Sequence, residues 1–439
     1  MKIGFVPIDN RPVCYLLPKL ISEIDKEIEL FLPDRSLLGD LTKPAKVDEI
    51  FDWLKSLPQL DAIVISLDTV AYGGLISSRR CSDSFEIIKN RIENLKSILK
   101  SKQAKIYAFS SIMRISNNDI NEEEKEYWNT WGKKIFEYSY NKSKFKTAET
   151  SVPNDILADY LATRKRNFEI NKIYLSWQKE NFFETLIFSK DDCAEFGLNV
   201  DEAKELESLG AFVKTGADEI PLSLLSRVIQ GEIKVAPVFL EPSYKNLISN
   251  YEDISIEKSV LSQLELAGCK IVNENDADIL LYINNFVENQ GEIVMKIDTK
   301  SFDKKWEYPK KPYMIADVRF ANGADNAFVE EIFKTDLNNN FYGYSAWNTS
   351  ANTLGSLICA AKIKFLAKNY DEISFKKLQI VRFLDDWAYQ ANVRQELDCD
   401  IQKGMKTWEN KVCEKFNLYP KIMYKLPWNR TFEVEIEFI

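Results

Sequence analysis

A chain of 439 residues with a net charge of −9 and no histidine excludes several classes of protein. The acidic balance argues against a nucleic-acid-binding surface, which is usually basic. Without histidine, neither a Ser-His-Asp triad nor a zinc site built on histidine can form. Acid–base chemistry near neutral pH therefore falls to Asp, Glu, Tyr, Lys or Cys side chains.

The cysteine pattern indicates a compartment. Seven cysteines without a CxxC pair are typical of a reduced, intracellular protein that lacks a disulfide framework. We find no secretory signal and no apolar stretch of membrane-spanning length. The expectation is a cytoplasmic protein with no membrane association.

The first 240 residues alternate strand-like and helix-like segments. The strand-like runs lie near residues 2–8, 28–32, 61–67, 104–110, 183–188, 211–214 and 234–240. Amphipathic segments separate them, and residues 141–180 form an insertion that we expect to be helical. Short apolar strands that alternate with helices predict βα units and a mostly parallel sheet.

The regular alternation of strand-like and helix-like segments changes after residue 240. Residues 279–283 and 314–318 are strand-like, and residues 255–267, 325–333 and 354–366 are helical. The charged region 288–312 predicts a β-hairpin or a surface excursion, and the chain ends in an alternating strand over 431–439. No internal repeat divides the sequence.

Two α/β architectures fit this order of elements. Because seven strand signals precede residue 241, we favour a (β/α)8-barrel-like domain over residues 1–275, with the helical insertion near 141–180. An α/β extension over 276–370 and a small α+β segment over 371–439 would follow. The alternative is a pair of doubly wound α/β lobes with a ligand between them.

Acidic side chains follow many of the strand-like runs. They are Asp9, Asp68, Asp191, Asp192, Asp218 and Glu219. The carboxyl ends of parallel strands share one side of a sheet, where ligands bind. We therefore expect Asp9, Asp68, Asp192 and Asp218 to face one cleft, with Trp347 and Asn348 nearby. Helix capping explains each acid about as well.

The segment after Asp68 has the composition of a ligand-binding turn. Tyr72 precedes the paired glycines Gly73 and Gly74, and Arg79 follows. Glycines let the backbone approach a ligand closely, and an arginine can clamp a carboxylate, a phosphate or a diol. The spacing matches neither a P-loop nor a dinucleotide fingerprint. A tight turn with Asp68 as a helix cap is the alternative.

Later segments combine aromatic, amide and charged side chains in a way that suits a neutral polyhydroxylated ligand. The candidate substrate-binding residues are Asp317, Arg319, Asp325, Trp347, Asn348, Asn352, Trp428, Asn429 and Arg430, with Arg11 near the start of the chain. A structural tryptophan beside a capped helix is the alternative, and it is favoured for Asp385-Asp386-Trp387.

Several of these motifs resemble an uncharacterised bacterial family, the domain of unknown function 4127 family. The resemblance rests on Pro7-Ile8-Asp9-Asn10-Arg11-Pro12, Tyr72-Gly73-Gly74 with Arg79, Gly216-Ala217-Asp218-Glu219, Trp347-Asn348-Thr349 with Asn352 and Gly355, and Pro427-Trp428-Asn429-Arg430. It spans essentially the whole chain, which implies a single evolutionary unit. It implies no activity.

The function that these patterns favour is a carbohydrate-active hydrolase, most simply a glycosidase with a small-molecule or glycan substrate. Glycoside cleavage uses two carboxyl groups and requires neither histidine nor a cofactor. We expect Asp192, beside Asp191, to work with Asp218 or Glu219 as the acid–base pair. Asp68, Arg79, Trp347 and Asn348 would hold the sugar.

Two other functions stay open. Asp9, Asp68, Asp192 and Asp317 could bind Mg²⁺ or Mn²⁺ in a metal-dependent hydrolase or phosphoryl-transfer enzyme. Arg11, Arg79 and Arg319 could instead clamp an anion in a binding protein without catalysis. No oligomeric state follows from the sequence.

Overall fold

The computed structural model describes residues 1–439 except 148, 192–193, 335–336, 338 and 398–399. The chain divides into two compact units, which we describe separately. The first unit contains Met1–Tyr15, Glu29–Leu224 and Tyr251–Asp253. The second unit contains Leu16–Ile28, Leu225–Asn250 and Ile254–Ile439.

The first unit is built on a six-stranded parallel sheet with the order β2-β1-β3-β4-β5-β6. The strands are β1 (Lys2–Val6), β2 (Glu29–Phe31), β3 (Ala62–Ser66), β4 (Lys105–Ile112), β5 (Thr185–Lys190) and β6 (Val213–Thr215). Each coincides with a strand predicted from the sequence. The residues of β3 are all buried, as expected for a parallel strand that is covered on both faces.

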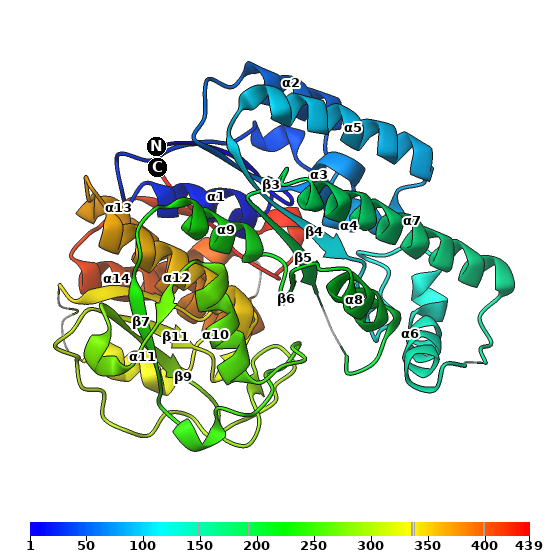
Figure 1. Ribbon diagram of the computed structural model, residues 1–439. Helices are drawn as coiled ribbons and strands as arrows, with labels where there is room; N and C mark the ends of the chain where they lie inside the picture. The colour runs from blue at the N-terminus through cyan, green and yellow to red at the C-terminus, as the bar shows by residue number, and fades with distance from the viewer. Residues whose placement is uncertain (148, 192–193, 335–336, 338, 398–399) are drawn as a thin grey trace. The chain divides into compact units, whose positions relative to one another are not determined.

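Helices alternate with these strands (Figure 1). They are α2 (Val47–Ser56), α3 (Leu67–Tyr72), α4 (Leu75–Arg80), α5 (Phe85–Lys102), α6 (Trp128–Phe145), α7 (Asn154–Lys179) and α8 (Leu198–Ser208). Phe51 of α2, Leu95 of α5 and Trp177 of α7 lie in one apolar core with the strand residues. Both α1 (Pro12–Ser22) and α9 (Ile220–Val228) contribute residues to each unit.

The second unit has its own five-stranded parallel sheet, with the order β13-β11-β9-β7-β8. The strands are β7 (Lys234–Phe239), β8 (Lys270–Ile271), β9 (Ile279–Asn284), β11 (Tyr313–Asp317) and β13 (Phe341–Ser345). Two small sheets accompany it, a parallel pair of β10 (Gly291–Glu292) with β12 (Phe320–Ala321) and an antiparallel pair of β14 (Ile422–Lys425) with β15 (Glu435–Phe438).

The helices of the second unit include one unusual segment. They are α10 (Ile256–Leu266), α11 (Asn326–Phe333), α12 (Ser350–Leu366), α13 (Glu372–Arg382), the π-helix η4 (Phe383–Val393) and α14 (Ile401–Phe416). Leu354 and Ile358 of α12 pack in the core against Leu281 of β9 and Met314 of β11. The π-helix contains Asp385, Asp386 and Trp387, so the helical interpretation of that motif is confirmed.

The strand pairings confirm an α/β fold with parallel sheets, but they do not confirm the (β/α)8 barrel that the sequence favoured. Within the described ranges, the first sheet ends at β2 and β6, and β7 belongs to the second sheet. A barrel requires its first and last strands to pair. Here β2 and β6 are edge strands of only three residues.

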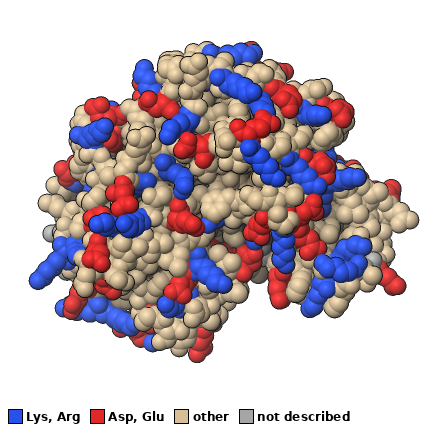
Figure 2. Space-filling model, in the orientation of Figure 1, with Lys and Arg blue, Asp and Glu red and all other residues tan. Residues whose placement is uncertain are grey.

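Charged side chains of both signs are interspersed on the face of the molecule that Figure 2 shows. The net charge of −9 therefore reflects a modest excess of acids among many basic residues. In the part of the chain that the structure describes, no helix has the length and apolar character needed to span a membrane.

Asp25 connects two distant segments of the second unit by hydrogen bonds. Asp25 belongs to the segment Leu16–Ile28, and its partners include residues 368 and 369. The buried Asp25 carboxylate accepts hydrogen bonds from the backbone N–H groups of Lys368 and Asn369, each at 3.1 Å. It also accepts one from Glu27 N at 3.1 Å. A charged acceptor thus satisfies three backbone donors that come from opposite ends of the sequence.

Replacement of Asp25 by alanine should destabilise the protein by about 2 kcal/mol, because buried donors lose a charged acceptor. Urea unfolding measures this loss. The matched variant Asp52→Ala removes a carboxylate whose side chain is 77% exposed, and it should change stability by less than about 0.5 kcal/mol. Equal effects of the two substitutions would contradict the role given to Asp25.

Candidate functional site

Charged residues follow the carboxyl ends of five strands in the first sheet. Asp9 follows β1, Asp68 follows β3, Arg114 follows β4, Asp191 follows β5 and Asp218 follows β6. Because the strands are parallel, all five residues lie at the same edge of the sheet. This edge is the candidate site of the first unit.

Arg11 joins two of these carboxylates. Its Nε donates to Asp9 Oδ2 at 2.8 Å, and its backbone N–H donates to Asp9 Oδ1 at 3.0 Å. Its Nη2 and Nη1 donate to Asp218 Oδ1 at 2.5 Å and Oδ2 at 3.2 Å. All three residues are less than 9% exposed. Burial raises the pKa of Asp9 more than the neighbouring Arg11 charge lowers it.

The Arg11 bridge requires two loops to converge. Three strands separate β1 from β6 in the sheet. At the usual spacing of about 4.8 Å, the two strands are about 19 Å apart. The loops that carry Asp9 and Asp218 therefore extend toward each other over the ends of the intervening strands. The structure brings together two predicted acids that are 209 residues apart in sequence, Asp9 and Asp218.

Glu219 lies against the backbone of Gly216. Its Oε2 accepts a hydrogen bond from Ala217 N at 3.1 Å. Gly216 has a φ of +115°, and a Cβ atom there would lie 1.7 Å from Glu219 Oε1. Burial, followed by the charges of Asp218 and Glu252, raises the pKa of Glu219 to about 8. Glu219 is therefore a protonated acid at neutral pH.

Asp68 is a second buried acid at this edge. It stands in the first turn of α3, which the Ser66 hydroxyl caps. Its Oδ2 accepts a hydrogen bond from Ser111 N, at the end of β4, at 2.8 Å. Burial raises the pKa of Asp68 to about 7, although the Ser111 hydrogen bonds and the Arg79 charge oppose this. The capping role belongs to Ser66, so Asp68 is not explained as an N-cap.

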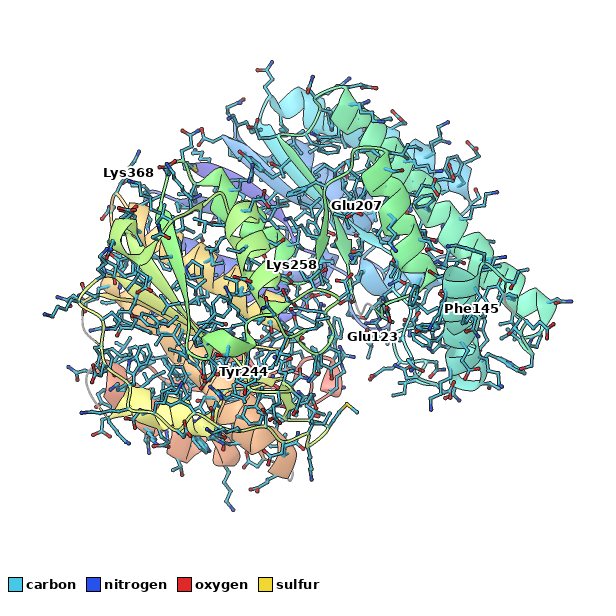
Figure 3. All side chains as sticks on the ribbon, turned by 60° about the horizontal axis from the view of Figure 1, so that its bottom comes forward. Glu123, Phe145, Glu207, Tyr244, Lys258 and Lys368 are labelled. Atoms are coloured by element: carbon cyan, nitrogen blue, oxygen red, sulfur yellow. The ribbon has the colours of Figure 1, made fainter. Side chains whose placement is uncertain are left out.

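Arg79 pairs with acids of its own unit. Its Nε lies 3.3 Å from Glu124 Oε1, and its Nη2 lies 3.5 Å from Glu123 Oε2. Arg114 shares both acids, at 3.3 Å and 2.8 Å, and also lies 3.6 Å from Asp191. Glu123, labelled in Figure 3, belongs to the segment between β4 and α6. The predicted clamp Arg79 is thus part of a buried ion-pair network, and Asp191 joins it through Arg114.

The paired glycines have backbone conformations that other residues adopt with strain. Gly73 ends α3 with a φ of +92°, and Gly74 precedes α4 with a φ of +129°. A Cβ at Gly73 would lie 2.6 Å from Pro44 Cβ. The turn therefore requires glycine for conformation and for close packing. Tyr72 is buried beside it.

In the second unit, Asp317, Arg319 and Asp325 form a buried network at the ends of β9 and β11. Asp317 accepts hydrogen bonds from Asn284 Nδ2 at 2.8 Å, Asp325 N at 2.9 Å and Tyr344 OH at 3.1 Å. Arg319 Nε donates to Asn284 at 3.0 Å and lies 3.5 Å from Asp325. Burial, with the nearby Asp325 charge, raises the pKa of Asp317. These predicted substrate-binding groups are engaged with the protein itself.

Trp347, Asn348 and Asn352 also belong to the second unit. Trp347 is buried, and its carbonyl accepts a hydrogen bond from the Thr353 hydroxyl at 3.0 Å. Asn348 has a φ of +60°, and its side-chain oxygen lies 3.4 Å from Asn352 Nδ2. Thr349 caps α12. A structural tryptophan beside a capped helix therefore describes this motif well.

The motif at residues 427–430 has a strained backbone. Trp428 and Asn429 have φ values of +57° and +54°. The Arg430 guanidinium lies over the Trp428 ring, 4.7 Å from its centroid, and 5.3 Å from the centroid of Phe432. Backbone strain of this kind is often found at functional sites. The Arg430 guanidinium and the Trp428 ring form a cation–π contact.

Sequence reasoning missed Lys190 and Asp253. Lys190 Nζ lies 2.6 Å from Asp253 Oδ2, and the Thr215 hydroxyl donates to Asp253 Oδ1 at 2.9 Å. Lys190 is the last residue of β5 and precedes Asp191, so its position at the end of a predicted strand could have indicated it. Asp253 had none, because it comes from a short segment, Tyr251–Asp253, that joins the first unit from a distant part of the sequence.

No group of three or more histidine, cysteine or acidic side chains suited to a metal ion occurs in the part of the chain that the structure describes. The Mg²⁺ or Mn²⁺ alternative requires such a set of oxygen ligands. Asp192, one of the predicted ligands and catalytic residues, lies outside the described residues.

Comparison with known proteins identifies one family. The family described as "Protein of unknown function (DUF4127)" has a model that matches residues 3–412 of the 439. No curated protein matches the sequence.

Replacement of Gly216 by alanine should destabilise the protein by about 3 kcal/mol, because the new Cβ would displace Glu219 in addition to straining a positive φ. The matched variant Gly210→Ala also strains a positive φ, +94°, but has nothing within 4 Å of the new atom. It should cost about 1 kcal/mol. Urea unfolding measures the free energy of unfolding of both variants. Equal losses of stability would contradict the packing of Glu219 on Gly216.

The protonation of Asp68 predicts a pH dependence of stability. Unfolded Asp68 ionises near 3.8, whereas folded Asp68 keeps its proton to about pH 7, so Asp68 lowers stability as pH rises between these values. Relative to wild type, Asp68→Asn should therefore gain stability across this window, by up to about 4 kcal/mol.

Urea unfolding at several pH values between 4 and 8 measures this difference for Asp68→Asn. The exposed-site variant Asp52→Asn serves as the control, and its difference from wild type should change far less. A difference between Asp68→Asn and wild type that is constant across the range would show that folded Asp68 is ionised throughout.

Proposed function

Because the chain belongs to the DUF4127 family, whose description names no activity, we propose a function from the side chains alone: hydrolysis of a glycosidic bond by Glu219 and Asp218. The observation that supports this is the contrast between two neighbouring carboxyl groups. Glu219 is buried against Gly216, whereas Asp218 is paired with Arg11. Glycoside hydrolysis needs two carboxyl groups with different roles, which different surroundings can provide.

Glu219 is the general acid in this proposal. Its raised pKa of about 8 keeps the proton on the carboxyl group at neutral pH. The backbone N–H of Ala217 and the close contact with Gly216 limit the positions that the carboxyl group can take. An acid with a pKa near the working pH transfers its proton efficiently to a leaving group.

Asp218 is the partner carboxyl group. Its two oxygens accept hydrogen bonds from Nη1 and Nη2 of Arg11, which stabilise negative charge on the carboxylate. A carboxylate in this state can stabilise the positive charge that develops on the sugar ring, or can act as a nucleophile or a base. Arg11 is a positioning residue, since it also holds Asp9.

The bond changes balance with water as the second reactant. The bond between the anomeric carbon and the glycosidic oxygen breaks, and its electron pair stays with the oxygen, which takes the Glu219 proton. Water supplies the hydroxyl group to the anomeric carbon, and its remaining proton restores the acid–base pair. In this proposal Asp68, which lies at the same edge of the sheet, binds a hydroxyl group of the sugar.

Glu219→Gln should lower kcat/KM about 10²- to 10⁴-fold on glycosides with poor leaving groups, because no proton reaches the departing oxygen. It should affect 2,4-dinitrophenyl glycosides much less, since that leaving group needs no proton. Wild-type kcat/KM should fall as pH rises through about 8, and this limb should disappear in the variant. A panel of aryl glycosides, assayed across pH, makes these measurements.

Glu184→Gln is the matched control, because the Glu184 side chain is 47% exposed and comes just before β5. It should retain wild-type kcat/KM. Asp218→Asn and Asp192→Asn, assayed with and without EDTA, test which of these two acids, both predicted from the sequence, is the partner of Glu219. Wild-type activity in Glu219→Gln on poor leaving groups would disprove the assignment.

A further inference from the structure

Three residues from a distant part of the sequence join the candidate site of the first unit. Tyr251–Asp253 is part of the first unit, whereas the residues on either side of it belong to the second. Lys190 Nζ lies 2.6 Å from Asp253 Oδ2, and the Thr215 hydroxyl donates to Asp253 Oδ1 at 2.9 Å. Lys190 and Thr215 are paired in the sheet as the last residues of β5 and β6. Asp253 therefore anchors the segment to the carboxyl ends of two neighbouring strands.

These strand ends carry the turn on which Glu219 packs. Gly216 directly follows Thr215, and its backbone N–H donates to Lys190 O at 2.8 Å. The Glu219 carboxyl group lies so close to Gly216 that a Cβ atom there would be 1.7 Å from Glu219 Oε1. The anchor of Asp253 and the contact of Glu219 thus involve adjacent residues, Thr215 and Gly216.

Glu252 is confined by its two neighbours in the chain. Asp253 is anchored to the strand ends, and Tyr251 has a φ of +67°, which bulky residues rarely adopt. Backbone strain that the surrounding structure maintains is often found at functional sites. Glu252 itself is 7% exposed, and its Cα lies about 3.8 Å from that of Asp253. The fold therefore places a buried carboxyl group directly beside the anchor.

The Glu252 charge acts on Glu219. Burial is the largest cause of the raised pKa of Glu219, and the charges of Asp218 and Glu252 add to it. A negative charge close to a carboxyl group favours the form that keeps its proton. The other charges around this turn are compensated by ion pairs, Arg11 with Asp218 and Lys190 with Asp253.

We propose that Glu252 is a third acid of the site: Asp253 positions it beside Glu219, and its negative charge keeps the proton on Glu219 at neutral pH. This inference rests on the proposed role of Glu219 as the general acid. Glu252 and Asp253 are positioning residues, because they act through Glu219 and not on the substrate.

Urea unfolding of the full chain across pH tests the effect of Glu252 without an assay of activity. Unfolded Glu219 ionises near pH 4.5, whereas folded Glu219 keeps its proton to about pH 8. Wild type therefore loses stability relative to Glu219→Gln as pH rises between these values, and the difference levels off above about pH 8. When both proteins also carry Glu252→Gln, the difference should level off about one pH unit lower. An unchanged pH would overturn the proposal.

Two variants control for the substitution at residue 252. Glu252→Asp keeps the negative charge, so the difference should level off near the wild-type pH. A shift as large as that of Glu252→Gln would show that charge is not the cause, and would overturn the proposal. Glu184→Gln removes an acid just before β5, at the opposite end of this strand from Lys190, and should leave the pH unchanged. Equal shifts with Glu184→Gln and Glu252→Gln would also overturn it.

Thr215→Val tests the anchor, because it removes a hydrogen bond to Asp253 without a change of charge. Glu252 should then be held less firmly, and the difference should level off at a lower pH, by a smaller amount than with Glu252→Gln. Combined with Glu252→Gln, Thr215→Val should cause no further shift, because both substitutions act through the same charge. An equal shift with and without Glu252 would overturn the positioning role of Asp253.

Enzyme assays separate this inference from the proposed function. The fall of kcat/KM at alkaline pH should begin about one pH unit lower in Glu252→Gln than in wild type, with little change in kcat/KM on the acid side. An equal loss of kcat/KM at every pH would overturn the proposal. Full activity of Glu219→Gln on poor leaving groups would instead disprove hydrolysis by Glu219, whereas the unfolding measurements would still decide whether Glu252 acts on Glu219.

Discussion

The ion pairs of Arg11 with Asp9 and Asp218 organise the candidate site of the first unit. Three charged side chains are buried together, at 2.8 Å and 2.5 Å between the paired atoms. Loss of one partner from such a group leaves an uncompensated charge in a medium of low dielectric constant, which is strongly destabilising. The loops after β1 and β6 are therefore held together by a constraint that the sheet itself does not provide.

Burial raises the pKa of two acids at this edge of the first sheet. Desolvation is the largest cause of the raised pKa of both Asp68 and Glu219, and in both cases hydrogen bonds to the backbone only partly offset it. A protein that lacks histidine can obtain acid–base groups for neutral pH in this way, since a carboxyl group removed from water keeps its proton to higher pH. Gly216 makes this burial possible for Glu219 by leaving room for its carboxyl group.

The predicted motifs fall into two physical classes once the fold is known. Asp68 and Glu219 each accept a hydrogen bond from a backbone N–H group, whereas Arg79, Asp317 and Arg319 take part in internal networks of ion pairs and hydrogen bonds. A sequence shows the same residue types in both cases. Arg79 belongs to its network because Glu124 reaches it from a different part of the chain.

The sequence by itself determined the local elements and the positions of the acids. All six strands of the first sheet and β7 were predicted, because apolar runs of strand length and their polar ends are local properties. Only the tertiary structure decided that the strands form two open sheets, that Arg11 joins Asp9 to Asp218, and that Asp253 reaches Lys190. Strand pairing and ion pairing depend on which distant segments meet in space, and no local pattern of residues encodes that.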